Sequence, residues 1–251
     1  MQHTSSEKIG NIINAFTEPV ILTLSDIKTD YDLTTENGKH GLAWDIRFNR
    51  IKTRALLNNF VVLTKKRNNL WSFICVLDDS DDILYVFVKN KNLMRIKKEF
   101  GKNSIHYFHA IVSLDGKPHD LNELQLSLFP PLSQEYELNR LLEVKKVLGD
   151  DHLRVKEVRF IVAKEEDRQI VGAEVHKYDR YFNLTSIEDY SNYVSLPTVN
   201  EITLNSELTD EKEQQVVIPK IKDSLKKQQK IETKLKSLNK EKEVQETKNK
   251  I

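Results

Sequence analysis

Two histidines, His106 and His109, lie three residues apart in a segment whose apolar residues repeat at helical spacing. Residues three apart are neighbours on a helix, so both imidazoles could ligate one metal ion, with His119 or Asp120 as a third ligand. Zinc signatures space their ligands differently, and His109 falls on the apolar stripe of its helix, where a buried structural histidine is expected. We therefore expect no metal site, and His106 and His109 are retained only as candidates for one.

An acidic run, Asp78-Asp79-Ser80-Asp81-Asp82, could also bind a cation. An EF-hand loop that begins at Asp78 requires glycine at its sixth position and glutamate at its twelfth, but Ile83 and Lys89 occupy them. We therefore interpret the run as the solvated turn of a hairpin. It would serve a Mg²⁺-dependent nuclease only if further ligands came from elsewhere in the fold.

Basic residues form three groups that could contact phosphates. Lys65, Lys66 and Arg67 occupy an expected hairpin turn before Trp71. The second group follows the next hairpin and consists of Lys89, Lys91, Arg95, Lys97 and Lys98. The third lies near the C-terminus and includes Lys222, Lys226, Lys227, Lys230 and Lys234. The alternative for these groups is a solvated turn or helix face, which needs no ligand.

Other common chemistries lack their signatures. The glycines form neither a G-x-G-x-x-G nor a P-loop pattern, and no serine lies in a nucleophile-elbow context. Cys75, the single cysteine, lies within an apolar run, and burial raises the pKa of a thiol and makes it a poor nucleophile. The sequence therefore predicts no cofactor.

Charge is distributed unevenly along the chain, although its net value is only +1. Residues 220–251 hold eleven lysines and five acidic residues, whereas the rest of the chain holds 28 basic and 33 acidic residues. No apolar run approaches the roughly 18 residues that would span a bilayer, and the first residues lack the order of a signal peptide. We expect a cytoplasmic protein that does not enter a membrane.

Apolar periodicity predicts about five helices, over roughly residues 5–16, 42–58, 93–100, 105–112 and 133–148. Segments 60–64, 71–77 and 83–88 are rich in β-branched and aromatic residues, and their short polar connections favour an antiparallel meander. Segments 158–163 and 170–175 predict a second hairpin. Helices and strands occur in separate runs, so the predicted fold class is α+β with an antiparallel sheet.

The last of these helices has explicit boundary signals. Ser133 is the expected N-cap and Gly149 the expected end, and the expected stripe of this helix consists of Leu138, Leu141, Leu142, Lys145 and Leu148.

The sequence further predicts three parts: an α+β body over residues 1–195, a polar connector over residues 196–219, and a lysine-rich tail over residues 220–251. The tail contains only a thin apolar stripe, so it is not a convincing coiled coil. A solvated helix, a polyanion-binding arm and a partly disordered segment remain alternatives.

Several short landmarks resemble an uncharacterised family found in Firmicutes and their phages. They are Ala43-Trp44-Asp45 with Asn49, Trp71 in a strand, Leu84-Tyr85 in the next strand, and His106-Tyr107 at the start of a helix. The resemblance covers roughly residues 5–195. It implies a bacterial or phage origin and a place among mobile-element, defence or counter-defence proteins, and it carries over no functional residues.

The absence of a catalytic motif and the split in charge favour a non-enzymatic binding or regulatory protein that contacts protein or nucleic acid. The alternative is a metal-dependent nuclease or toxin-like enzyme that uses His106, His109 and the acidic run. An oligomeric state does not follow from the sequence.

Overall fold

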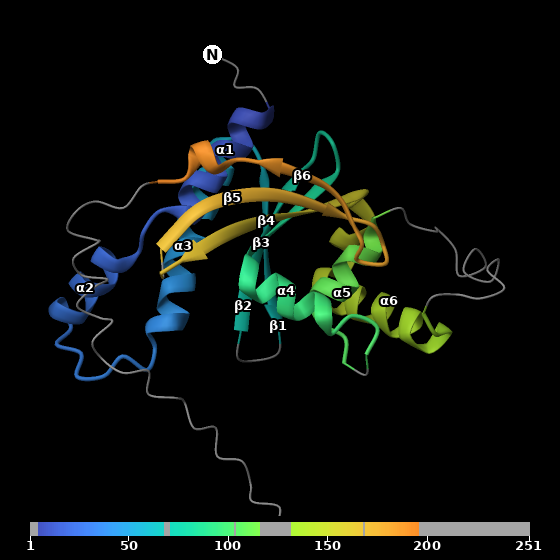
Figure 1. Ribbon diagram of the computed structural model, residues 1–251, viewed down its shortest axis with the longest axis horizontal. Helices are drawn as coiled ribbons and strands as arrows, with labels where there is room; N and C mark the ends of the chain where they lie inside the picture. The colour runs from blue at the N-terminus through green and yellow to red at the C-terminus, as the bar shows by residue number, and fades with distance from the viewer. Residues whose placement is uncertain (1–4, 68–70, 103, 116–131, 168, 196–251) are drawn as a thin grey trace, which may run out of the picture. The chain divides into compact units, whose positions relative to one another are not determined.

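A single six-stranded sheet organises the part of the chain that the computed structural model describes, residues 5–67, 71–102, 104–115, 132–167 and 169–195 (Figure 1). Its strands follow the order β1-β2-β3-β4-β5-β6. They are β1 (Val61–Arg67), β2 (Trp71–Asp78), β3 (Ile83–Lys89), β4 (Glu157–Glu166), β5 (Gln169–Tyr178) and β6 (Leu184–Asp189). The α+β class, the meander β1–β3 and the hairpin β4–β5 are thus confirmed.

One pair of neighbouring strands departs from the antiparallel pattern. β3 and β4 run parallel, with Ile83 opposite Glu157 and Lys89 opposite Ala163. Parallel neighbours require a long crossover, which here runs through α4 (Asn90–Lys98), α5 (Tyr107–Ile111) and α6 (Gln134–Leu148). The carboxyl ends of β3 and β4 therefore meet at one edge of the sheet.

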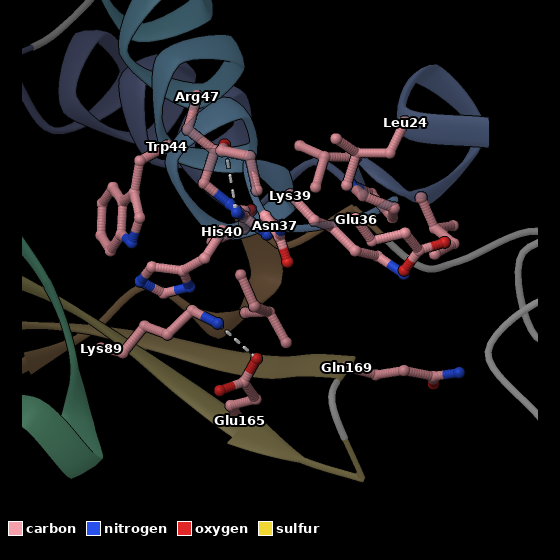
Figure 2. Close-up of a pocket in the computed structure, with 16 residues that line it drawn as sticks. Leu24, Glu36, Asn37, Lys39, His40, Trp44, Arg47, Lys89, Glu165 and Gln169 are labelled. Carbon is pink, nitrogen blue, oxygen red and sulfur yellow. Dashed lines mark hydrogen bonds and ion pairs between the residues drawn. The ribbon is translucent and has the colours of Figure 1, made fainter. Parts of the chain in front are cut away.

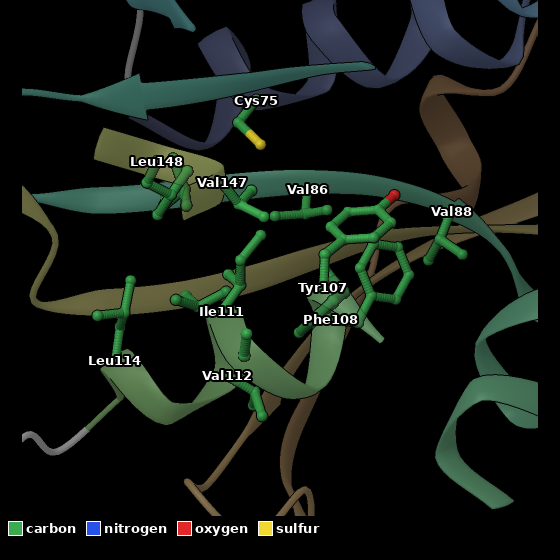
Figure 3. Packing of buried hydrophobic residues seen from close by; sticks show 14 of the residues in the cluster. Cys75, Val86, Val88, Tyr107, Phe108, Ile111, Val112, Leu114, Val147 and Leu148 are labelled. Carbon is green, nitrogen blue, oxygen red and sulfur yellow. The ribbon is translucent and has the colours of Figure 1, made fainter. Parts of the chain in front are cut away.

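Helices cover both faces of the sheet (Figure 1). α1 (Ser5–Thr17) and α3 (Lys39–Leu57) pack on one face, where Phe16 and Trp44 belong to the same apolar cluster as Ile74 and Val76 of β2. The crossover helices pack on the other face, where Phe108 joins the cluster that includes Cys75 (Figure 3). Consecutive residues of a strand point to opposite faces, so β2 supplies both clusters.

The predicted signals at the ends of α6 are confirmed. The hydroxyl of Ser133 accepts a hydrogen bond from the backbone N–H of Tyr136 at 3.2 Å. Gly149 ends the helix with φ 59°, a conformation that glycine adopts without strain. The same reasoning applies to Gly101, with φ 76°, just after α4.

The predicted stripe of α6 is only partly right. Leu148 is buried, but Leu138 and Leu142 are exposed, whereas Arg140 is completely buried. Its guanidinium donates to the backbone oxygens of His109 at 2.9 Å and Arg180 at 2.6 Å, and to the carboxylate of Glu137 at 2.9 Å. The buried face of α6 therefore combines a hydrogen-bonded ion pair with Val144, Val147 and Leu148, and apolar periodicity alone cannot reveal the ion pair.

Other predictions also need correction. α2 (Ile21–Asp30) occupies a stretch for which no helix was predicted, and β6 was not predicted. Lys65, Lys66 and Arg67 lie within β1 rather than in a turn, because that strand continues to pair as far as Trp71 of β2. The connector and tail predicted for residues 196–251 lie outside the described residues. None of the helices in the described ranges has the length and apolarity that a bilayer-spanning segment needs.

Candidate anion-binding site

A pocket of about 420 Å³ opens where β3 and β4 end, and we refer to it as the Arg47 pocket (Figure 2). The first half of α3 contributes His40, Trp44 and Arg47, and the strand ends contribute Lys89 and Glu165. The remaining lining residues are Thr17, Pro19, Val20, Ile21, Leu24, Glu36, Asn37, Lys39, Ala43, Gln169 and Ile170. In open sheets with parallel strands, ligands commonly bind outside the carboxyl ends of those strands.

Arg47 is the unusual residue of this pocket. Only 8% of it is exposed, and its Nε finds no hydrogen-bond partner among the described residues. Its Nη1 donates to the backbone oxygen of Ala43 at 3.3 Å, an acceptor within the same helix (Figure 2). Burial is the main cause that lowers the pKa of Arg47. A buried guanidinium without a carboxylate partner is costly, and an anion in the pocket would relieve that cost.

The neighbouring charges are already paired. Lys89 Nζ lies 2.6 Å from Glu165 Oε1 (Figure 2). Glu36 is bridged by Lys39 at 2.7 Å and by Lys28 at 2.9 Å, and the hydrogen bond from Lys39 is the main cause that lowers the pKa of Glu36. The lining thus contains more permanent cations than carboxylates, and Arg47 supplies the excess charge.

One wall of the pocket is apolar and comes from the junction between α1 and α2. Pro19, Val20, Ile21 and Leu24 form it. Arg50 of α3 fixes this junction, because its guanidinium donates to the backbone oxygen of Pro19 at 2.9 Å and of Glu18 at 3.2 Å and to the hydroxyl of Thr23 at 3.2 Å. The pocket therefore places an apolar surface beside a buried cation.

A smaller hollow of about 140 Å³ shares His40 and Trp44 with the Arg47 pocket. It is lined further by Phe48, Trp71, Phe87, Val88, Asn92, Arg95, Ile96, His106, Tyr107 and Phe108. Trp44, Trp71 and the His106-Tyr107 pair, which are landmarks of the sequence resemblance, thus converge on adjoining hollows. Arg95, from the second predicted basic group, reaches this hollow, and Lys89 from the same group reaches the Arg47 pocket.

The histidine pair has a structural role in the described fold. His109 is fully buried, its Nε2 lies 2.8 Å from the backbone oxygen of Ile96, and its Nδ1 accepts from the backbone N–H of His106 at 3.3 Å. Both ring nitrogens of His109 are thereby engaged, so it cannot ligate a metal without losing these bonds. His106 caps α5, since its Nδ1 accepts from the backbone N–H of Phe108 at 3.1 Å.

The acidic run forms the β2–β3 turn at the other end of β3. Asp79 pairs with Arg154 at 2.5 Å, and Asp82 pairs with Lys156 at 2.5 Å. Because a strand rises about 3.3 Å per residue, this turn lies roughly 20 Å from the end of β3 where His106 lines the small hollow. Within the described ranges, histidine, cysteine and carboxylate side chains nowhere gather in threes that could hold a metal ion.

Only some of the predicted phosphate-binding residues lie within the described part of the chain. Lys65 Nζ lies 2.7 Å from both Asp151 and the backbone oxygen of Leu148, so its charge is already compensated. Lys66 is exposed on β1, next to Arg67 in the same strand. Lys222, Lys226, Lys227, Lys230 and Lys234 lie outside the described residues. Nucleic-acid contact by these groups stays a prediction.

Sequence reasoning missed Arg47 as a functional candidate, although a signal was present. Trp44, Phe48, Ile51 and Ala55 form the predicted apolar stripe of α3, and Arg47 falls within that arc at helical spacing from Trp44 and Ile51. A basic residue inside an apolar stripe is either paired internally or available to a ligand.

Of three comparisons with known proteins, one gives a match. No curated protein and no solved structure matches it. A family model matches residues 1–240, which is nearly the whole chain. The chain therefore belongs to the family of unknown function DUF5986.

Proposed function

We propose that this protein is a non-enzymatic binding or regulatory protein that takes up a small anionic ligand in the Arg47 pocket. The observation that carries the proposal is the buried guanidinium of Arg47, whose Nε has no partner among the described residues. Guanidinium groups form short, charge-assisted hydrogen bonds with carboxylates and phosphates, often two at a time. An anion beside Arg47 would supply the missing acceptor.

The surroundings of Arg47 add positive potential. α3 begins at Lys39, its N-cap Gly38 provides no side-chain hydrogen bond, and its first residues line the pocket. The N-terminus of a helix carries a partial positive charge that favours anions. Glu165 forms its ion pair with Lys89, although its charge also attracts Arg47 and partly offsets the lowering of the Arg47 pKa by burial. The helix N-terminus and the guanidinium of Arg47 would thus both attract an anion.

Thermal unfolding of the full chain tests this proposal. The protein is dialysed into chloride buffer, and its Tm is measured with acetate, 3-phenylpropionate or inorganic phosphate at constant ionic strength. We expect at least one anion to raise Tm, because a ligand at about 100 times its Kd stabilises the folded state by about 2.7 kcal/mol.

Arg47→Gln should abolish that rise, because it removes the charge and most of the donors. Arg54→Gln is the matched control, since Arg54 is an exposed arginine on the same helix. Equal rises in Tm for the wild type and for Arg47→Gln would contradict the proposal.

A second set of contacts is proposed from the sequence alone. Lys66 and the lysine-rich residues 220–251 carry the charge for a protein or nucleic-acid partner, supported by the excess of lysine in that segment. An origin in Firmicutes or their phages, a part in defence or counter-defence, and a cytoplasmic location belong to the same proposal. Binding of labelled DNA and RNA across salt concentrations tests it, and failure to bind at low salt would end its nucleic-acid version.

A further inference from the structure

We infer that the ligand of the Arg47 pocket is a monocarboxylic acid with a compact apolar body. The inference rests on the proposed anion binding and narrows it to one chemical class. It excludes inorganic phosphate and nucleotides as preferred ligands. Charge balance, the apolar wall and the size of the pocket each support it.

Charge balance favours a single negative charge. The lining carries three permanent cations, Arg47, Lys39 and Lys89, against the carboxylates Glu36 and Glu165. Lys28 and Lys39 pair with Glu36, and Lys89 pairs with Glu165, so Arg47 is the lining cation that forms no ion pair among the described residues, and one carboxylate would match its charge. A phosphate dianion or a polyphosphate would leave excess negative charge near Glu165, where like charges in a partly buried site repel strongly.

The walls favour an apolar body. Pro19, Val20, Ile21 and Leu24 lie on one side of the pocket, and Ile170 of β5 also lines it. A ligand whose carboxylate reaches Arg47 can place its remaining atoms against these side chains. Burial of apolar surface would then add to the affinity that the charge provides. A hydrated inorganic anion gains nothing from such a wall.

The dimensions of the pocket suit such a molecule. Its volume of about 420 Å³ lies near the lower end of the range of about 300–1,000 Å³ that is usual for small-molecule sites. The guanidinium is planar and matches the two oxygens of a carboxylate. A compact acid with one ring or a short branched chain thus fits both the volume and the charge.

Isothermal titration calorimetry on the full chain tests the inference with five probes. 3-Phenylpropionate has both the charge and the apolar body, 3-phenylpropanamide has the body without the charge, and acetate has the charge without the body. Inorganic phosphate and adenosine monophosphate represent the excluded class. We expect 3-phenylpropionate to bind at least about tenfold more tightly than each of the other four.

Two substitutions separate the contributions of charge and wall. Arg47→Gln should weaken 3-phenylpropionate about tenfold or more, because a charged hydrogen-bonded pair is lost. Leu24→Ala should weaken it several-fold through lost apolar contact, whereas Leu22→Ala on the exposed side of α2 should leave affinity unchanged.

The outcomes distinguish this inference from the proposed function. If phosphate or adenosine monophosphate binds most tightly and Arg47→Gln abolishes that binding, the inferred carboxylic acid ligand is wrong. The proposed binding of an anion in the Arg47 pocket is then still supported. If the amide binds as tightly as the acid, or if Arg47→Gln changes no affinity, both are wrong. If acetate binds as tightly as 3-phenylpropionate, the inferred apolar body of the ligand is wrong, and the proposed anion site is still supported.

Discussion

Two buried arginines should respond in opposite directions to the same substitution. Arg47 is 8% exposed and has an Nε without a partner among the described residues, whereas Arg140 is 0% exposed and donates three hydrogen bonds. Methionine preserves much of the aliphatic stem and removes the charge and all donors. We therefore predict that Arg47→Met stabilises the ligand-free protein and that Arg140→Met destabilises it.

The magnitude for Arg47 follows from its contacts. An unsatisfied buried donor costs about 1–3 kcal/mol, and the hydrogen bond to Ala43 that the substitution also removes contributes only about 1 kcal/mol. The free energy of unfolding should therefore rise by about 1 kcal/mol. A chain of this size shifts its Tm by about 2–4 °C for each kcal/mol.

The magnitude for Arg140 is larger and has the opposite sign. Its removal leaves the buried carboxylate of Glu137 with the Arg180 guanidinium, 3.5 Å away, as its one remaining ion-pair partner among the described residues. Loss of one partner from a buried ion pair costs about 3–5 kcal/mol, and the remaining contact with Arg180 favours the lower end. Tm should therefore fall by about 6–12 °C.

Urea unfolding at pH 7 measures both variants against the wild type, after extensive dialysis into chloride buffer that removes bound carboxylates and phosphates. Midpoints and slopes together give the change in the free energy of unfolding. A loss of stability in Arg47→Met that matches the loss in Arg140→Met would refute the reasoning. Arg47 would then be a structural arginine with a partner, and the anion-binding site would lose its main support.

Three further predictions concern other parts of the fold. Burial raises the pKa of Cys75 to about 12, so Ellman's reagent should modify it only after unfolding, and rapid native reaction would contradict its burial. Burial lowers the pKa of His109, so its stabilising contribution is present above about pH 6.5 and is lost as pH falls through its depressed folded-state value. His109→Asn should flatten that part of a stability–pH profile, and an unchanged slope would assign the loss to other groups. Gly10→Ala should lower the free energy of unfolding in urea by about 1–3 kcal/mol, because a Cβ would lie 2.2 Å from the Tyr193 ring. Gly41→Ala is the control, since a Cβ there meets open space, and it should not destabilise the protein. Equal effects of the two substitutions would contradict this packing.

The predicted helices and strands were largely right, because their signals are local. The N-cap at Ser133 and the glycine at position 149 each act on neighbouring backbone groups, and they fixed both ends of α6. The predicted stripe of the same helix missed the buried Arg140, because the partners of Arg140 include Arg180, forty residues away. Such a partner leaves no trace in the periodicity of a helix.

Arg47 left a signal in the apolar stripe of α3, but sequence patterns could not show which residues assemble around it, for the same reason. His40 and Arg47 come from α3, Lys89 from the end of β3, and Glu165 from the end of β4. His106, His109 and the acidic run were the first candidates in the sequence. In the structure His106 caps α5, His109 is buried in the core, and the acidic run forms surface ion pairs. Residue types identified candidate functional side chains, but only the tertiary structure showed which side chains lie together in one pocket.

The sequence by itself determined the α+β class, the antiparallel meander and hairpin, and the buried cysteine, since these follow from local periodicity and from short connections. Only the tertiary structure decided that β3 and β4 pair in parallel across a crossover, because that choice depends on packing between residues far apart in the chain. The same packing buries Arg47 beside the ends of β3 and β4 and leaves its Nε without a hydrogen-bond partner among the described residues. A charged side chain whose type predicts exposure is thereby buried in the lining of a pocket.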